Sequence, residues 1–245
     1  FDEIEKKDIR INDLVWVKRA GDVIPYISKV EKSKRSKNTK IFKIPSNCPC
    51  GKFKIIKKES EAVQRCNGGL KCPYQFIESL KHFVSKKAMN IDGLGEKQIE
   101  KFIELKFIAN KLDIYKLNKF QNEITSLEGF GKKSYENLIN SINKSKNTSL
   151  SRFLFSLGLR YVGENNSDLL AKYFQSKENF EKLIESKDIN IELENIDGLG
   201  AKATNSIIEY FMNKKQKKDA LSVLNLLNID VIEDEKNSKN ETILF

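Results

Sequence analysis

The spacing of hydrophobic residues changes along the chain, from alternation near its start to a helical period over most of its length. Between residues 9 and 27, apolar and polar positions alternate in short runs, and turn-forming residues at 12–13 and 20–22 separate the runs. From residue 76 onward, apolar residues recur three and four positions apart, as on one face of an amphipathic helix. We therefore expect a mainly α, multi-domain chain whose opening strands form part of a small β-barrel.

A five-residue motif recurs in the helical part. It reads IDGLG at residues 91–95, LEGFG at 127–131 and IDGLG at 196–200, and a diverged copy, LRYVG at 159–163, keeps only the second glycine. The second glycines are 36, 32 and 37 residues apart, and an amphipathic stretch follows each of them. The sequence therefore predicts four units of helix, tight glycine hairpin and helix.

The physical chemistry of such a hairpin favours phosphate as its ligand. The first glycine permits a positive φ, and the second begins a helix whose unpaired N–H groups and positive dipole end face outward. Because this glycine has no Cβ, an anion can approach closely; the apolar residue between the glycines is expected to be buried. The candidate DNA-binding residues are Gly93, Gly95, Lys97, Gly129, Gly131, Lys132, Lys133, Gly163, Gly198, Gly200 and Lys202.

Two other interpretations of the glycines were weighed. They could simply cap helices in an ordinary bundle, and one copy would not decide between capping and binding. Four copies in a chain with 44 Lys and Arg against 34 Asp and Glu favour sequence-independent binding to a nucleic-acid backbone. The net charge of +10 alone does not favour nucleic-acid binding, because an AT-rich genome also produces abundant Lys, Asn and Ile. A solenoid of 34-residue repeats would lack a glycine pair at every joint.

The four cysteines fall within 25 residues, in the order C-x-C, 15 residues, C-x5-C. Clustered cysteines in a cytosolic chain favour zinc over disulfides, and four thiolates at Cys48, Cys50, Cys66 and Cys72 would complete a structural tetrahedral site. Residues 53–63 could form a short hairpin between the two pairs. The first pair is one residue shorter than a usual C-x2-C knuckle, so a metal-free knuckle is the alternative.

Several remaining features bear on location and neighbours. His82, the only histidine, is expected to pack or to cap a helix, and the basic run at 29–43 to be a loop near DNA or a solvated linker. No apolar run could span a bilayer and no leader is present, so we expect a cytoplasmic monomer without a membrane partner. The chain opens on Phe1 and not on Met, and residues 9–17 already have a strand-like pattern, so we expect a piece of a longer protein.

Taken together, these residues resemble the C-terminal portion of bacterial NAD-dependent DNA ligases, in register over almost the whole chain. The resemblance implies an OB-fold segment at 1–44, a zinc finger at 45–75, a helix-hairpin-helix domain at 76–228 and a linker at 229–245. It is carried by residues 8–11, 19–25, 48–51, 65–67, 72–73, 82–95 and 157–164.

For the parent enzyme, the resemblance implies that a lysine attacks NAD, that AMP passes to the 5′-phosphate of a nick, and that the 3′-hydroxyl displaces it, with Mg²⁺ assisting. It also implies that Arg19 and Asp22 approach phosphates or the adenylate. The family's Lys-x-Asp-Gly nucleophile motif is absent, because Asn90 and Asn195 stand two residues before the aspartates of the two Asp-Gly pairs. This chain is therefore expected to hold no catalytic residue and to form no adenylate alone.

The family's terminal interaction domain is missing unless residues 242–245 begin it. Two rival functions stay open at this point: a non-enzymatic helix-hairpin-helix protein, and the DNA-binding part of an excision nuclease. The nuclease offers no reason for the order of OB segment, zinc finger and hairpins.

Overall fold

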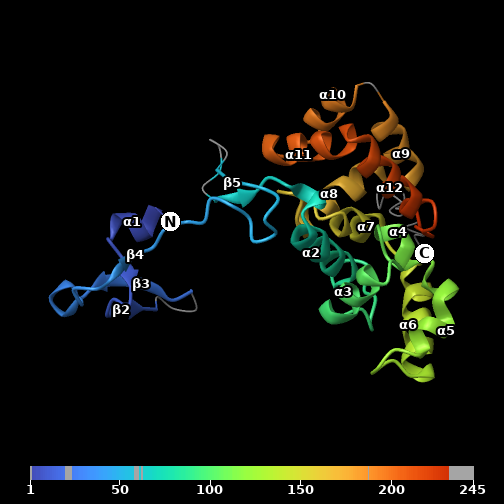
Figure 1. Cartoon of the computed structure of the whole chain (residues 1–245). Coiled ribbons are helices and arrows are strands. Elements are labelled where there is room, and N and C mark those ends of the chain that lie inside the picture. Colours follow the sequence, from blue (N-terminus) through green and yellow to red (C-terminus); the bar gives the residue numbers. More distant parts are fainter. Residues whose placement is uncertain (1, 20–23, 58–60, 62, 187, 232–245) are drawn as a thin grey trace, which may run out of the picture. The chain divides into compact units, whose positions relative to one another are not determined.

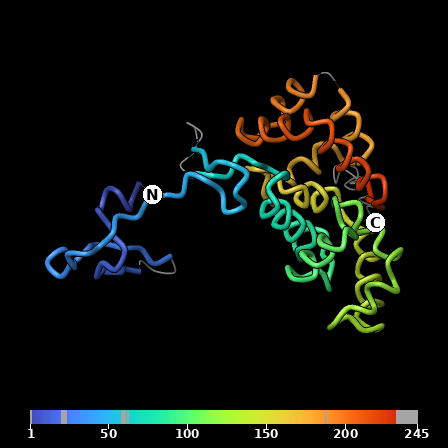
Figure 2. Tube along the Cα trace, viewed as in Figure 1, coloured from blue at the N-terminus to red at the C-terminus, as the bar shows by residue number. Residues whose placement is uncertain are grey.

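The computed structural model describes residues 2–19, 24–57, 61, 63–186 and 188–231. It divides into two compact units, residues 1–68 (unit 1) and residues 69–245 (unit 2), and is mainly helical, as the sequence predicts. Figure 1 labels the elements and Figure 2 follows the Cα trace through both units. No described helix is long and apolar enough to cross a membrane.

Unit 1 begins with a short helix and four short strands, which confirm the alternating pattern. The helix α1 (Asp2–Lys6) precedes β1 (Arg10–Ile11), β2 (Val15–Lys18), β3 (Tyr26–Val30), the 3-10 turn η1 (Lys32–Lys34) and β4 (Lys40–Ile41). Antiparallel pairs form between β1 and β4 and between β2 and β3, and the second pair shifts register after Trp16. These two-stranded ladders close no barrel within the described residues.

The basic run at 29–43 is neither a free loop nor a solvated linker, because Arg35 anchors it. The Arg35 guanidinium donates to both carboxylate oxygens of Asp13, at 2.9 and 2.8 Å, and to Asp8 at 2.6 Å. The Asp13 side chain is only 1% exposed. Hydrogen bonds from Arg35 hold the pKa of both carboxyl groups below the usual range. A side chain 22 to 27 residues away in sequence thus fixes the first turns of the unit.

The cysteine segment of unit 1 contains the predicted hairpin. Strand β5 (Ile55–Ile56) pairs antiparallel with β6 (Arg65–Cys66), and an isolated bridge joins Asn47 to Lys54. The backbone N–H of Cys48 donates to the Phe53 carbonyl at 2.8 Å, which closes the turn that carries the first cysteine pair. The short ladder therefore positions three of the four cysteines.

Unit 2 is a helical domain in which the apolar spacing of the sequence becomes buried faces. In α6, for example, Tyr135, Leu138 and Ile142 are buried and the residues between them are largely exposed. Proline stands at the start of α2, where its missing N–H costs nothing. The helical elements are η2 (Gly69–Lys71), α2 (Pro73–Val84), α3 (Glu96–Glu104), α4 (Lys111–Ile114), η3 (Leu117–Phe120), α5 (Gln121–Thr125), α6 (Lys132–Ser145), α7 (Leu150–Ser156), α8 (Glu164–Phe174), α9 (Lys177–Glu185), α10 (Ile189–Glu194), α11 (Ala201–Met212) and α12 (Lys214–Leu224).

One hydrophobic cluster runs through all of unit 2. Helix α2 packs on α3, α7 on α8, and α11 on both α10 and α12 (Figure 1). Phe83, Phe102, Phe153 and Phe180 are completely buried within the cluster. Burial of large aromatic side chains from several repeats makes the hairpins parts of a single domain.

Two polar side chains tie the first repeats to α7. His82 Nε2 lies 2.7 Å from the Phe155 carbonyl oxygen and its ring packs against the Phe155 ring, so the expected packing role of His82 is confirmed. The Lys111 ammonium donates to the carbonyls of Ser156, at 3.3 Å, and Leu157, at 3.0 Å, at the end of α7. Burial lowers the pKa of Lys111 to about 8.

Candidate nucleic-acid interface

The second glycine of each motif directly precedes a helix, which confirms the predicted geometry. Gly95 precedes α3, Gly131 precedes α6, Gly163 precedes α8 and Gly200 precedes α11, all with extended backbone. These glycines provide no side-chain cap, whereas α4, α7, α9 and α12 each begin with an Asn or Ser that accepts a hydrogen bond from the first turn. The first-turn N–H groups of the four hairpin helices are therefore available to another acceptor.

The position of the first glycine in each motif has a left-handed backbone conformation. The φ angles are +89° at Gly93, +78° at Gly129 and +84° at Gly198, the region that glycine enters without steric cost. In the diverged third copy, Tyr161 occupies this position with a φ of +62°. The third hairpin therefore keeps the backbone of the other three although its first glycine is replaced.

The surface beside the second glycines is open. A Cβ added at Gly131, Gly163 or Gly200 would meet no described atom within 4 Å, and one added at Gly95 would meet only the flexible end of Gln98. All four glycines are exposed. An anion can therefore reach the first-turn N–H groups without displacing protein atoms.

The apolar residue between the first and second glycine positions of each motif faces the core. Leu94, Val162 and Leu199 are buried, and Phe130 is partly buried, with its ring centroid 5.6 Å from that of Phe102. The expectation that this residue inserts into the core is confirmed for three hairpins and holds in part for the second. Each hairpin is thus anchored in the core by this residue, while its second glycine faces outward.

The hairpins associate in pairs, numbered here 1 to 4 in chain order. In hairpin 1, Gly93 packs toward Leu138 of α6, and the N–H of Asp92 donates to Ser141 Oγ at 2.8 Å. In hairpin 4, Gly198 packs toward Leu169 of α8. Hairpin 1 therefore rests on the helix of hairpin 2, and hairpin 4 rests on the helix of hairpin 3.

Charged residues of both signs flank the hairpins, and exposed lysines lie beside three of the four second glycines. Lys97, Lys132, Lys133 and Lys202 all lie within two residues of a second glycine and are all exposed. The first turns of α6 and α11 contain no acidic residue. Glu96 of α3 pairs with Lys81 at 3.0 Å and Glu164 of α8 with Lys87 at 2.7 Å, so nearby lysines offset these carboxylates.

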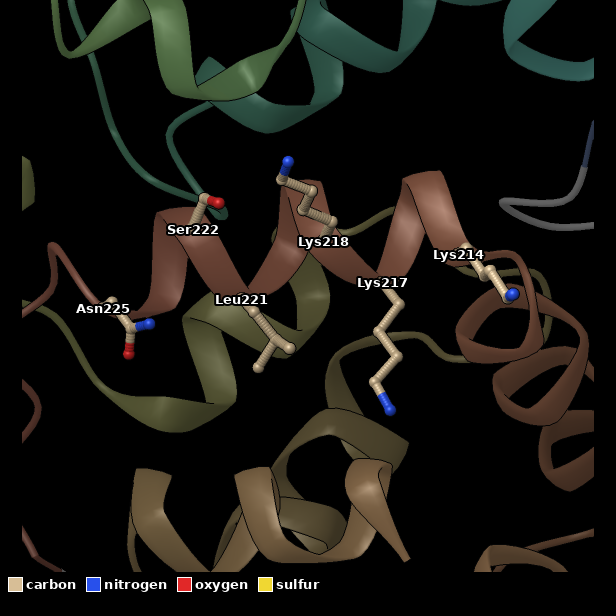
Figure 3. A pocket seen from close by; sticks show the side chains of 6 residues that line it. All are labelled: Lys214, Lys217, Lys218, Leu221, Ser222 and Asn225. Atoms are coloured by element: carbon tan, nitrogen blue, oxygen red, sulfur yellow. The ribbon is translucent and has the colours of Figure 1, made fainter. Parts of the chain in front are cut away.

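A second basic surface, which the sequence analysis missed, lies along α12. Its shallow groove is lined by Lys214, Lys217, Lys218, Leu221, Ser222 and Asn225 (Figure 3). Lys217 points toward α9 and donates to the carbonyl of Ile184 near the end of that helix, so it has a structural role. The sequence does contain a sign of this surface: four lysines stand in the first five residues of α12, at a helix N-terminus where the dipole disfavours cations. Helix α12 begins beyond the far end of α11, about 18 Å of helix from Gly200.

The predicted metal ligands belong to both units. In unit 1, the sulfur atoms of Cys48 and Cys50 lie within 4.8 Å of each other. Two sulfurs on one tetrahedral zinc ion are about 3.8 Å apart, given a Zn–S bond of about 2.3 Å, so this pair suits zinc. Cys66 lies on β6, where its sulfur accepts from the N–H of Gly68 at 3.4 Å, and Cys72 directly precedes α2 in unit 2.

The two OB-segment candidates are not tested by the structure. Arg19 is exposed directly after β2. Asp22 lies outside the described residues, as do the linker residues 233–240 and residues 242–245. Their suggested approach to phosphate or adenylate stays a prediction.

Two family models match parts of the chain. Residues 1–39 match the family model described as the NAD-dependent DNA ligase OB-fold domain, and residues 152–219 match the helix-hairpin-helix motif. Over 255 aligned residues, the chain is 46% identical to a protein named DNA ligase from Pelagibacter ubique. The alignment covers all of this chain and 37% of that protein.

Other relatives show the same relation. A DNA ligase from Rickettsia bellii is 43% identical over all of this chain and 36% of its own length, and one from Neorickettsia sennetsu is 43% identical over 86% of this chain and 32% of its own. The chain thus spans about a third of the relatives it matches. It belongs to the NAD-dependent DNA ligases, as the C-terminal portion that carries the OB-fold and helix-hairpin-helix segments.

Proposed function

We propose that this chain is the part of an NAD-dependent DNA ligase that holds nicked duplex DNA while the rest of the enzyme seals the 5′-phosphate to the 3′-hydroxyl. The observation that carries the proposal is the set of four helix N-termini that begin with exposed, uncapped glycines, three of them beside exposed lysines. Repeated N–H cradles on one domain suit a polymer of phosphates better than one small anion.

Binding in this manner is independent of base sequence. The N–H groups that follow Gly95, Gly131, Gly163 and Gly200 would donate to phosphate oxygens, and the neighbouring lysines would add charge. Phosphate contacts fix the position of a protein on the duplex but carry no sequence information. A ligase needs this property because nicks occur in any sequence.

The remaining roles follow from the same assignment. We place a structural zinc ion on Cys48, Cys50 and Cys72, with Cys66 as the fourth ligand, and propose that it stabilises the β5–β6 hairpin. NAD and Mg²⁺ would serve the nucleotidyl chemistry in the rest of the enzyme, and Arg19 and Asp22 would face the phosphates or the adenylate. The protein would act as a monomer in the cytoplasm, where its DNA substrate is found.

The binding proposal is tested by fluorescence anisotropy of the 245-residue chain with labelled nicked duplexes of several sequences. We expect one affinity for all sequences, and a loss of about 10³ between 50 and 200 mM salt if about six phosphates are contacted. The double variant Lys132→Ala, Lys133→Ala should make the plot of log affinity against log salt less steep, by the amount that about two phosphate contacts contribute. The same chain mixed with labelled NAD should form no AMP adduct.

The matched control removes two charges away from the hairpins, by Lys214→Ala and Lys218→Ala on α12. It should change the salt slope less than the hairpin pair does. Equal losses for the two double variants would assign the affinity to net charge alone. A chain that does not bind duplex DNA, or that acquires labelled AMP from NAD, contradicts the proposed function.

A further inference from the structure

Hairpin 3 differs from the others at one residue that neither packing nor backbone conformation explains. Tyr161 has a φ of +62° where the other three hairpins have glycine. For a residue with a bulky side chain, this conformation costs free energy that glycine avoids. An exposed residue in this state indicates a function more than a structural need.

Neighbouring groups hold Tyr161 in this conformation. The side-chain amide of Asn166 donates to the Tyr161 carbonyl at 2.7 Å, and Val162, the next residue, is buried in the core. The Tyr161 side chain itself is 47% exposed and therefore adds little to the core. Glycine offers the same carbonyl acceptor and adopts a positive φ at the matching position of hairpins 1, 2 and 4.

The ring of Tyr161 lies beside a charged side chain of hairpin 4. The Lys202 ammonium lies 5.7 Å from the centre of the ring, within the range of a cation–π interaction. Lys202 is the second residue of α11, next to the uncapped first turn that follows Gly200. The aromatic ring thus connects the turn of hairpin 3 to the basic side chain of hairpin 4.

This arrangement has a consequence for an extended ligand. A cation–π contact restricts where the lysine ammonium lies, yet leaves its N–H groups free to donate to an oxygen. Hairpins 3 and 4 each present an open glycine cradle, at Gly163 and Gly200. A strand that fills both cradles would pass the Tyr161–Lys202 pair on its way.

We propose that Tyr161 is a DNA-contacting and positioning residue: its ring holds the Lys202 ammonium toward a phosphate and contacts a deoxyribose of the same strand. This inference rests on the proposed function of the hairpins. It predicts that hairpins 3 and 4 bind one continuous stretch of backbone as a unit, with Tyr161 as the connection.

Tyr161→Gly separates a binding role from a structural one. Glycine removes the ring and relieves the backbone strain, so the variant should be at least as stable to urea as the parent chain. Its affinity for nicked duplex should nevertheless fall, by about fivefold if the cation–π contact dominates. Tyr161→Phe keeps the ring and should bind like the parent.

A double-mutant cycle and a matched control complete the test. Adding Lys202→Met to Tyr161→Gly should cost less than the sum of the single changes, because the two residues act together. Tyr173→Ala removes a tyrosine of similar exposure, 49%, from the other end of α8 and should leave affinity unchanged.

Three outcomes would overturn the inference: Tyr161→Gly binds as tightly as the parent, Tyr161→Gly is less stable than the parent, or Tyr161 and Lys202 contribute additively. Any of these, with the parent still binding duplex, leaves the proposed function intact. Failure of the parent chain itself to bind duplex would instead contradict the proposed function.

Discussion

Unit 1 and unit 2 are stabilised by different interactions. Unit 2 buries completely the side chains of several phenylalanines from different repeats in one cluster. Among the described residues of unit 1, only two hydrophobic side chains, Val30 and Cys48, are buried. Large apolar side chains such as Trp16, 60% exposed, and Ile24, 83% exposed, face solvent there.

What replaces a core in unit 1 is polar. The contacts of Arg35 with Asp8 and Asp13 hold its first turns together, and its cysteine segment carries Cys48, Cys50 and Cys66, three of the four proposed zinc ligands. Such interactions depend on protonation and on metal supply, whereas apolar burial depends on neither. The order of unit 1 should therefore respond to solution conditions that leave unit 2 unchanged.

The largest expected effect comes from removing metal. The chain as purified should contain about one zinc ion, and a chelator should abolish amide protection in residues 45–57 and 63–72. The helices of residues 73–231 should keep their protection, because their core needs no metal. Hydrogen exchange measured by mass spectrometry resolves the two segments. Zinc content near zero with full protection would support the metal-free knuckle instead.

A core substitution should give the reverse result. Phe153→Ala removes a fully buried ring from α7 and should destabilise unit 2 by about 3–5 kcal/mol. Far-UV circular dichroism reports on the helices, while the fluorescence of Trp16, the only tryptophan, reports on unit 1. Tyr74→Ala, at a side chain 55% exposed, is the matched control and should change little. If both signals shift together, the two units unfold as one and the comparison fails.

Acid should produce the smallest of these effects, confined to the first turns of unit 1. Hydrogen bonds from Arg35 lower the pKa of Asp8 and Asp13 in the folded state. Their contribution is fully present above the unfolded pKa of about 4 and is lost as pH falls through the lower folded values. The stability difference between the parent and Arg35→Met, followed by Trp16 fluorescence, should therefore shrink below pH 4. A difference that is constant from pH 7 to pH 2 would contradict this role of Arg35.

The sequence predicts the hairpins well because their geometry depends on single residues. A left-handed φ and a missing Cβ are properties of glycine itself, so Gly129 and Gly131 could be recognised without any knowledge of their neighbours. The helical spacing that follows each motif is equally local. Burial of Leu94, Val162 and Leu199 then follows from the same pattern.

Other features could not be read from the sequence because they depend on distant partners. Arg35 is one basic residue among many in its run, and only the fold brings Asp8 and Asp13 to it. Tyr161 carries no sequence sign of a left-handed backbone, because tyrosine rarely adopts one. The position of Cys66 on β6, beside Gly68, also depends on the path of a short hairpin.

The seating of hairpins 1 and 4 on neighbouring helices has an evolutionary consequence. Because Gly93 packs toward Leu138 and Gly198 toward Leu169, each outer glycine contacts the helix that carries the other hairpin of its pair. A Cβ at either position would lie 3.5 Å from the leucine, an ordinary contact, so a substitution there is disfavoured by the positive φ and by the helix of the neighbouring hairpin, which bounds the space beyond the Cβ. Substitutions are therefore expected to be selected by pairs of hairpins and not by single repeats, so sequence divergence along this chain should follow a period of two motifs.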